Sequence, residues 1–462
     1  DPSRIAEVLN RVIEKAFRGS APAQINVPRD YWTQVIDIEL PPIVRFERQG
    51  GGQDAIQRAA KMLSDAKFPV ILSGAGVVIG DAINECKALA EKLDAPVCNG
   101  YQHNDSFPGS HPLAVGPLGY NGSKAAMQLI SKADVVLALG TRLNPFSTLP
   151  GYGIDYWPKN ANIIQVDMNP DRIGLTKKVT VGIAGDAKQV AKQILDKLAS
   201  NAGDSGREDR KNLIHQTKSA WLQTLTSLDH EDDDPGTVWN KEARERDKDR
   251  MSPRQAWRAI QAGMPEDVII SSDIGNNCAI GNAYPTFEKP RKYLAPGLFG
   301  PCGYGFPSIL GAKIGCPDTP VIGFAGDGAF GISMNEMSSC AREEWPAITM
   351  VIFRNYQWGA EKRNSILWFD DNFVGTELDP ELSYAKVANA CGLKGVIANT
   401  MEETTKAIKQ SCEDQKKGIT TFIEIILNQE LGEPFRRDAM KKPVKVAGIS
   451  KSDMKPQKSL VS

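Results

Sequence analysis

The sequence has little histidine and almost no net charge. Only 4 of its 462 residues are histidine, and 55 Lys and Arg residues nearly balance 56 Asp and Glu residues. A net charge of −1 provides no strong field that would recruit nucleic acid or a membrane surface, so neither is expected as a partner. The histidines show no metal-ligand spacing. They therefore predict no metal site.

Paired cysteines and long apolar runs are also missing. The eight cysteines are scattered without Cys-x-x-Cys spacing, which argues against a zinc site or a disulfide framework and favours reduced thiols in a cytosol. No apolar run approaches the roughly 20 residues of a membrane span. The opening residues, Asp1-Pro2-Ser3-Arg4, do not form a signal peptide. Because the composition is ordinary for a soluble globular protein, we expect a cytoplasmic location.

The length allows roughly two to four domains, and the sequence pattern divides the chain into five segments. Residues 4–18 carry apolar side chains at helical spacing, and residues 23–28 form a predicted strand. One such unit is too small to bury a core, so residues 1–45 are expected to be the C-terminal remnant of a domain that begins outside this sequence. The remaining predicted segments are a central domain at 53–200, a solvated charged connector at 201–250, a third domain at 251–430 and a tail at 431–462.

Strands and helices alternate along both large segments. The predicted strands cover residues 70–72, 135–139 and 162–167 in the central segment, and 268–270, 321–325, 348–353 and 420–427 in the third. Those at 321–325 and 348–353 are continuously apolar and β-branched, which is typical of strands buried on both faces of a parallel sheet. The alternation predicts an α/β protein with doubly wound parallel sheets.

Asp327 and Asn355 each follow one of these apolar strands. Ligands bind at the carboxyl edge of such sheets, where the two side chains would present oxygen atoms together. Mg²⁺ prefers six oxygen ligands and is often shared with phosphate groups. Asp327, Asn355 and the Gln357 carbonyl could supply three of them, leaving two diphosphate oxygens and a water. Gly326 and Gly328 would let the backbone approach a phosphate, and the first N–H groups of the following helix would face it.

These paired stretches resemble the signature of thiamine-diphosphate enzymes. The resemblance implies that Mg²⁺ is held by Asp327, Asn355 and Gln357; Arg354 departs from the pattern, because asparagine is usual there. It also implies that Gly300 accepts a hydrogen bond from the aminopyrimidine and that Cys302 bends the cofactor, although Cys302 could instead be a small buried residue. The implied cofactor-binding residues are Gly275, Asn276, Asn277, Gly300, Cys302, Gly326, Asp327, Gly328, Ala329, Asn355, Gln357, Trp358 and Gly359.

Three further stretches narrow the resemblance to the sulfoacetaldehyde acetyltransferase family: Gly116–Gly122, Arg354–Lys362 and Asn428–Asp438. This resemblance covers the whole chain. It implies that sulfoacetaldehyde and phosphate are converted to acetyl phosphate and sulfite, through a carbanion of the cofactor and an acetyl-thiamine intermediate. Both substrates are anions of the kind that arginine recognises. The candidates for binding them, each of which could instead be a surface charge, are Arg354, Lys362, Arg363, Arg436 and Arg437.

The glycine-rich loops of the central segment raise the question of flavin. Related acetolactate synthases bind FAD with loops similar to Gly74-Ala75-Gly76 and Gly140-Thr141-Arg142. The spacing from Gly74 to Gly80 is one residue longer than the dinucleotide fingerprint, so FAD is not expected. His103 and His111 could face a cleft, although a hydrogen-bonded structural role is favoured.

The family resemblance leaves two alternatives and one missing part. The glutamate that activates the cofactor in this superfamily is expected to lie outside this sequence, so no catalytic residue is assigned. The chain could instead resemble acetolactate synthase or pyruvate oxidase in acting on pyruvate, or it could be a non-catalytic cofactor-binding fragment. Relatives build their active sites between subunits, so a homodimer or homotetramer is expected.

Overall fold

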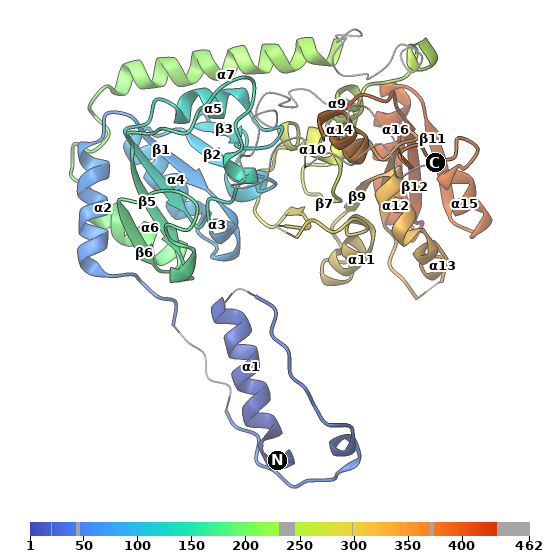
Figure 1. Cartoon of the computed structure of the whole chain (residues 1–462), viewed down its shortest axis with the longest axis horizontal. Coiled ribbons are helices and arrows are strands. Elements are labelled where there is room, and N and C mark those ends of the chain that lie inside the picture. The colour runs from blue at the N-terminus through green and yellow to red at the C-terminus, as the bar shows by residue number, and fades with distance from the viewer. Residues whose placement is uncertain are drawn as a thin grey trace, which may run out of the picture.

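The computed structural model describes residues 1–462 except 20, 43–46, 231–244, 298, 343, 369–373 and 432–462. Figure 1 shows two α/β lobes with the helix α7 running above them, and an N-terminal segment that extends away from both. Each lobe contains one six-stranded sheet, and all neighbouring strands pair in parallel. The prediction of doubly wound parallel sheets is therefore confirmed.

The first sheet belongs to the central lobe and has the order β3-β2-β1-β4-β5-β6. This is the order of the dinucleotide-binding fold. Strands β2 and β3 are added on one side of β1, and strands β4 to β6 are added on its other side. Its strands are β1 (Pro69–Ser73), β2 (Val97–Asn99), β3 (Ala114–Pro117), β4 (Val135–Leu139), β5 (Asn162–Asp167) and β6 (Val181–Ala184). Its helices are α2 (Gln53–Asp65), α3 (Ala75–Ile79), α4 (Ile83–Leu93), α5 (Lys124–Ile130) and α6 (Ala187–Lys197).

The second sheet belongs to the C-terminal lobe and has the order β11-β12-β10-β9-β7-β8. Its strands are β7 (Ile269–Ser272), β8 (Tyr293–Leu294), β9 (Val321–Gly326), β10 (Thr349–Arg354), β11 (Lys394–Ala398) and β12 (Thr421–Ile426). Its helices are α9 (Pro253–Gly263), α10 (Asn276–Ile280), α11 (Gly305–Gly315), α12 (Asp327–Ser333), α13 (Met337–Cys340), α14 (Gly359–Trp368), α15 (Tyr384–Ala390) and α16 (Met401–Gln415). A short 3-10 turn at Met334–Glu336 separates α12 from α13.

The apolar character of these strands has a direct structural cause. Successive side chains of a strand point to opposite faces of the sheet. Phe324 and Phe353 therefore enter the core on one face, around Trp257, whereas Ala325 and Ile352 enter the core on the other. Both faces are covered, so most positions on either face are apolar. The strand ends are the remaining places for polar side chains.

The structure corrects the prediction of a solvated connector. Residues Arg207–His230 form the 24-residue helix α7, which packs against α5 and α9. Its Trp221 and Leu225 are buried, and so are the charged side chains of Arg210 and Asp247. Burial is possible because backbone carbonyls surround Arg210 and two arginines pair with Asp247. Composition alone does not show such partners.

The N-terminal segment differs in part from its prediction. The helix α1 (Ile5–Gly19) forms as expected, but residues 23–28 are extended without joining a sheet and lead into a 3-10 turn at Arg29–Thr33. A strand needs a partner strand, and no described residue pairs with this segment. No helix in the described parts of the chain has the length and apolar composition to cross a bilayer.

Candidate cofactor site

The site lies where β7, β9 and β10 end. β9 and β10 are neighbours, and Asp327 and Asn355 directly follow them. Asp327 is fully buried and Asn355 nearly so. β8 lies on one side of β7, at the edge of the sheet, and β9, the next strand in the sequence, lies on the other side of β7. Ligands of open α/β sheets bind at such a reversal point.

The Asp327 carboxylate is fixed by hydrogen bonds from neighbouring protein groups. Its Oδ2 accepts hydrogen bonds from Arg354 Nη1 at 3.1 Å and from the Tyr356 N–H at 2.6 Å, and its Oδ1 accepts one from the Gly328 N–H at 3.0 Å. Burial raises the pKa of Asp327 to about 6, while the Arg354 guanidinium acts against that rise. Arg354 thus stabilises the ionised form of Asp327, and a divalent cation bound to the carboxylate would stabilise that form further.

Arg354 lies inside the protein. Its side chain is fully buried; Nη2 donates to the carbonyls of Leu382, at 2.9 Å, and Asp379, and Nε lies 3.6 Å from Glu424 Oε1. These partners place its guanidinium behind Asp327 as a countercharge. This position explains how arginine can stand where the family has asparagine, and it leaves the anion-binding prediction to the other basic residues.

The loop after β10 carries the other two predicted metal ligands. It is pinned by an antiparallel bridge: Trp358 N–H donates to Thr376 O at 2.8 Å, and Leu378 N–H donates to Tyr356 O at 3.0 Å. The Gln357 side chain donates to Gln429 O at 3.2 Å, whereas its backbone carbonyl is the group predicted to bind the metal. Within the described residues the Asn355 carboxamide makes no hydrogen bond, so its oxygen can serve a ligand.

The loop after β7 contains buried polar atoms that fit a ligand. Gly275 has φ of 126°, which glycine tolerates, and Asn276 and Asn277 then open α10. Asn276 Nδ2 and Asn277 Oδ1 are buried and have no hydrogen-bond partner among the described residues. Such atoms are costly unless a ligand or water satisfies them. A bound diphosphate group accepts hydrogen bonds, so it fits the donor Asn276 Nδ2.

Asp273 fixes the predicted pyrimidine loop to this edge. Its Oδ1 accepts from Gly303 N–H at 3.1 Å and its Oδ2 from Gly305 N–H at 2.7 Å. No role for Asp273 was predicted, although a carboxylate directly after a buried strand is the same signal that marks Asp327. Gly300 has φ of 61°, and the Cys302 side chain is exposed. That exposure argues against the alternative in which Cys302 is a small buried residue.

Two glycines of the site are distinguished by their surroundings. A Cβ atom on Gly328 would lie 2.7 Å from the Trp358 ring, so the close approach of that ring requires glycine. A Cβ on Gly326 would have no atom within 4 Å. Gly326 therefore leaves open space at the strand end, where a phosphate is predicted. Ala329 is buried in the core beside Phe330, and a Cβ on Gly359 would lie 3.2 Å from Asn276 Nδ2.

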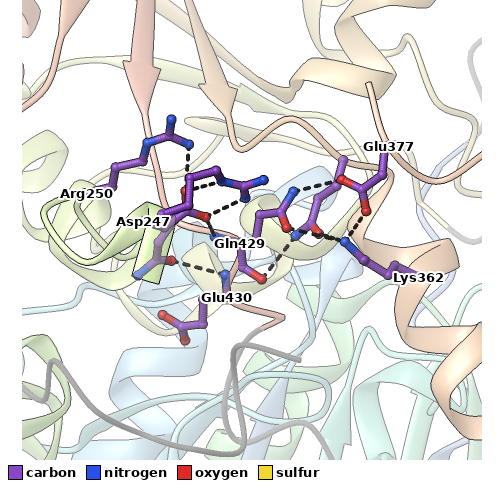
Figure 2. A network of polar contacts seen from close by, with 9 residues as sticks. Asp247, Arg250, Lys362, Glu377, Gln429 and Glu430 are labelled. Atoms are coloured by element: carbon purple, nitrogen blue, oxygen red, sulfur yellow. Dashed lines mark hydrogen bonds and ion pairs between the residues drawn. The ribbon is translucent and has the colours of Figure 1, made fainter. Parts of the chain in front are cut away.

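The basic candidates separate into different environments. Lys362 is fully buried and points into a polar network, where Nζ contacts Gln357 Oε1 at 3.1 Å and pairs with Glu377 (Figure 2). Burial lowers the pKa of Lys362. Arg363, by contrast, donates to Asn276 Oδ1 at 2.6 Å and to the Tyr120 hydroxyl. Arg436 and Arg437 lie outside the described residues.

Arg363 brings a residue of the central lobe to the site. Its guanidinium lies 5.3 Å from the centre of the Tyr120 ring, and burial lowers the pKa of Arg363 to about 9. Tyr120 belongs to the stretch Gly116–Gly122, and its carbonyl accepts from Asn282 Nδ2 at 3.1 Å. Asn104 Nδ2 joins the lobes nearby, donating to Asn282 O at 2.9 Å. Tyr120, from one of the stretches that carry the family resemblance, thus contacts Arg363 beside Asn276.

The glycine-rich loops of the central lobe have a packing explanation. A Cβ on Gly76 would lie 2.6 Å from Gly140 Cα, and one on Gly74 would lie 2.5 Å from Thr141 Cβ. The ends of β1 and β4 therefore touch through glycine.

His111 has a structural role. Its Nε2 lies 3.2 Å from Glu91 Oε1, and its Nδ1 accepts a hydrogen bond from Leu113 N–H at 3.2 Å.

Comparison with known proteins agrees with this architecture. The family model described as thiamine pyrophosphate enzyme, central domain, matches residues 56–194, and that described as thiamine pyrophosphate enzyme, C-terminal TPP binding domain, matches residues 273–425. Fold and site therefore define a thiamine pyrophosphate enzyme. Its sequence relatives are more specific: a Roseovarius nubinhibens protein named sulfoacetaldehyde acetyltransferase is 73% identical over 99% of this chain and 76% of its own length. The chain belongs to the sulfoacetaldehyde acetyltransferase family.

Two further comparisons extend this result. A Rhizobium meliloti protein named "Probable sulfoacetaldehyde acetyltransferase" is 77% identical over 460 residues, which are 100% of this chain and 78% of the relative. The crystal structure of benzoylformate decarboxylase from Polynucleobacter necessarius superposes with a TM-score of 0.70 and 18% identity, over 93% of this chain and 75% of that one. At that identity the structural match shows the fold alone.

Proposed function

We propose that this protein uses thiamine diphosphate and Mg²⁺ to convert sulfoacetaldehyde and phosphate into acetyl phosphate and sulfite. The observation that carries the proposal is the meeting of three groups at one sheet edge. Asp327 and Asn355 offer oxygen atoms, Asn276 Nδ2 offers a buried donor with no partner among the described residues, and Arg363 bonds the Oδ1 of the same Asn276. Metal, diphosphate and anionic substrate can therefore be held side by side.

The described residues divide between cofactor and substrate. Asp327, Asn355 and the Gln357 carbonyl would bind Mg²⁺, with Asn276 and Asn277 on the diphosphate, and Gly300 and Cys302 on the thiamine rings. When bound, thiamine diphosphate supplies a nucleophilic carbon that protein side chains lack. The protein contributes orientation, exclusion of water and charge.

Arg363 is the proposed sulfonate or phosphate ligand. A guanidinium recognises a multi-oxygen anion through several parallel N–H donors. Arg363 already touches the asparagine proposed to hold the diphosphate, so an anion bound there would lie next to the cofactor. The Tyr120 ring lies against the guanidinium and limits how it can turn.

The test is a product assay with two substrates supplied in turn. With thiamine diphosphate, Mg²⁺, phosphate and sulfoacetaldehyde, the purified protein should release sulfite and acetyl phosphate in equal amounts. Activity with pyruvate and none with sulfoacetaldehyde would replace the proposal with an acetolactate-synthase or pyruvate-oxidase type of reaction. If calorimetry shows that the cofactor binds but neither assay shows turnover, the chain is a non-catalytic cofactor-binding protein.

Location and assembly belong to the same proposal. All eight cysteines are free thiols, which is the ordinary state in a reducing cytoplasm. We propose a homodimer or homotetramer, because the thiamine ring loops around Cys302 are exposed here and a second subunit could cover them. Light scattering of the purified protein would decide between these states and a monomer.

A further inference from the structure

Tyr356 lies between the two loop residues that are proposed to bind Mg²⁺, and its backbone is strained. Its φ is 61°, which lies in the left-handed region that residues other than glycine and asparagine seldom adopt. Such conformations persist only where the surroundings hold them in place, and they cluster at functional sites. The conformation of Tyr356 decides how the Asn355 side chain and the Gln357 carbonyl are placed relative to each other.

Two guanidinium groups lie over the Tyr356 ring. That of Arg354 is 4.1 Å from the ring centre and that of Arg250 is 4.9 Å away. Both distances fall within the range of cation–π attraction. Arg354 is itself fixed by Asp327, so one side of this arrangement is part of the metal site.

Arg250 comes from the segment that precedes the C-terminal lobe and is anchored there. Its Nη1 lies 2.9 Å from Asp247 Oδ1, and its backbone N–H donates to Asp247 O at 2.9 Å (Figure 2). The Asp247 side chain is 1% exposed and also accepts from Gln429 N–H at 3.2 Å. Gln429 in turn bonds Gln357. Asp247, which anchors Arg250, and the loop that carries Asn355 and Gln357 therefore belong to one hydrogen-bonded network.

We propose that Arg250, together with Arg354, clamps the Tyr356 ring, keeps that residue left-handed and thereby positions Asn355 and the Gln357 carbonyl for Mg²⁺. Arg250 is a positioning residue, since it acts on the metal through Tyr356. The inference rests on the proposed cofactor function for its consequence, but the clamp itself is a property of the chain. It gives the predicted charged connector a role in shaping the site.

The first experiment measures Mg²⁺ affinity by calorimetry in the presence of saturating thiamine diphosphate. Arg250→Ala should weaken binding about two- to fivefold, because loss of one cation–π contact lowers the population of the competent loop by that factor. Arg250→Lys should fall between, since it keeps the charge but loses the planar group. Arg246→Ala is the matched control: Arg246 binds the same Asp247 carboxylate at 2.8 Å, and its removal should leave the affinity unchanged.

The second experiment needs no metal. Urea denaturation of Arg250→Ala, Tyr356→Gly and the double variant forms a double-mutant cycle. The clamp predicts coupling: once Tyr356→Gly has removed both ring and strain, Arg250→Ala should lower the midpoint less than it does in the wild type, because only its ion pair with Asp247 is then lost. Additive effects, or an Mg²⁺ affinity of Arg250→Ala equal to that of Arg246→Ala, would overturn the clamp. Failure of the wild type to bind Mg²⁺ would instead overturn the proposed function, and the cycle would still decide the clamp.

Discussion

Replacing Arg210 by methionine should destabilise the central lobe strongly. The side chain of Arg210 is 1% exposed, and it donates five hydrogen bonds to backbone carbonyls. The acceptors belong to three separate segments: Lys67 before β1, Leu93 and Asp94 at the end of α4, and Gly203 and Ser205 before α7. One guanidinium thus ties α7 to the sheet and satisfies the last carbonyls of α4, where a cation is also favoured by the helix dipole.

The size of the effect follows from the acceptors that would be left. Methionine fills a similar space but offers no donor, so five carbonyls would lose a charged partner. With each bond contributing about 1 kcal/mol net, and with some gain from no longer burying a charge, we expect a loss of roughly 3–5 kcal/mol. At a urea dependence of about 2 kcal/mol per molar, the midpoint should fall by roughly 1.5–2.5 M.

The assay is urea denaturation of the whole chain, followed by circular dichroism and by tryptophan fluorescence. Trp221 on α7 packs against Tyr152 with ring centres 5.4 Å apart, which gives a local probe of this region. Arg207→Met is the matched control on the same helix, because Arg207 is 34% exposed and its bridges to Asp94 and Asp204 are at the surface. It should cost less than about 1 kcal/mol. Equal, small shifts for both variants would refute the reasoning.

Three further predictions concern the site and its surroundings. Arg363→Ala should raise KM for sulfoacetaldehyde or for phosphate about tenfold or more, as expected for a lost charged hydrogen bond; unchanged KM values for both would dismiss Arg363. Gly328→Ala should cost about 1–3 kcal/mol in thermal unfolding, because its Cβ would lie 2.7 Å from Trp358, whereas the control Gly326→Ala has open space. Burial lowers the pKa of His103 to about 4, so the unfolded chain is protonated first as pH falls. Stability should therefore drop by up to about 2 kcal/mol between pH 7.5 and 5, and His103→Gln should lose this share; an identical pH dependence in the variant would contradict it.

Much of the fold could be predicted from the sequence because both sheets obey a simple rule. Strands buried on two faces are mainly apolar, and β4, β9 and β10 appear in the sequence as nearly uninterrupted apolar runs. The positions of Asp327 and Asn355 at neighbouring strand ends follow from the same rule, since the polar residue after each run has only one edge to occupy.

The parts that could not be predicted depend on partners distant in the sequence. Arg210 and Asp247 lie in a charged segment, and nothing local indicates that carbonyls or arginines will surround them. Arg354 is similar: its basic side chain suggested an anion, but the fold places it against Asp327 and Glu424. Charge shows that a partner is needed, whereas only tertiary structure shows whether that partner is substrate or protein.

The network around Gln429 also has a consequence for the order of folding. The C-terminal lobe begins and ends at the same point: Met251 forms a parallel bridge with Leu427, and Asn428 N–H donates to Met251 O at 2.9 Å. A nascent chain that stops before Gln429 could already contain β7, β9 and β10, but it would lack the acceptor for the Gln357 side chain. The loop at residues 355–357 therefore gains this contact only after β12 has been synthesised and has joined the sheet, so that its final conformation is a late step in the folding of the lobe.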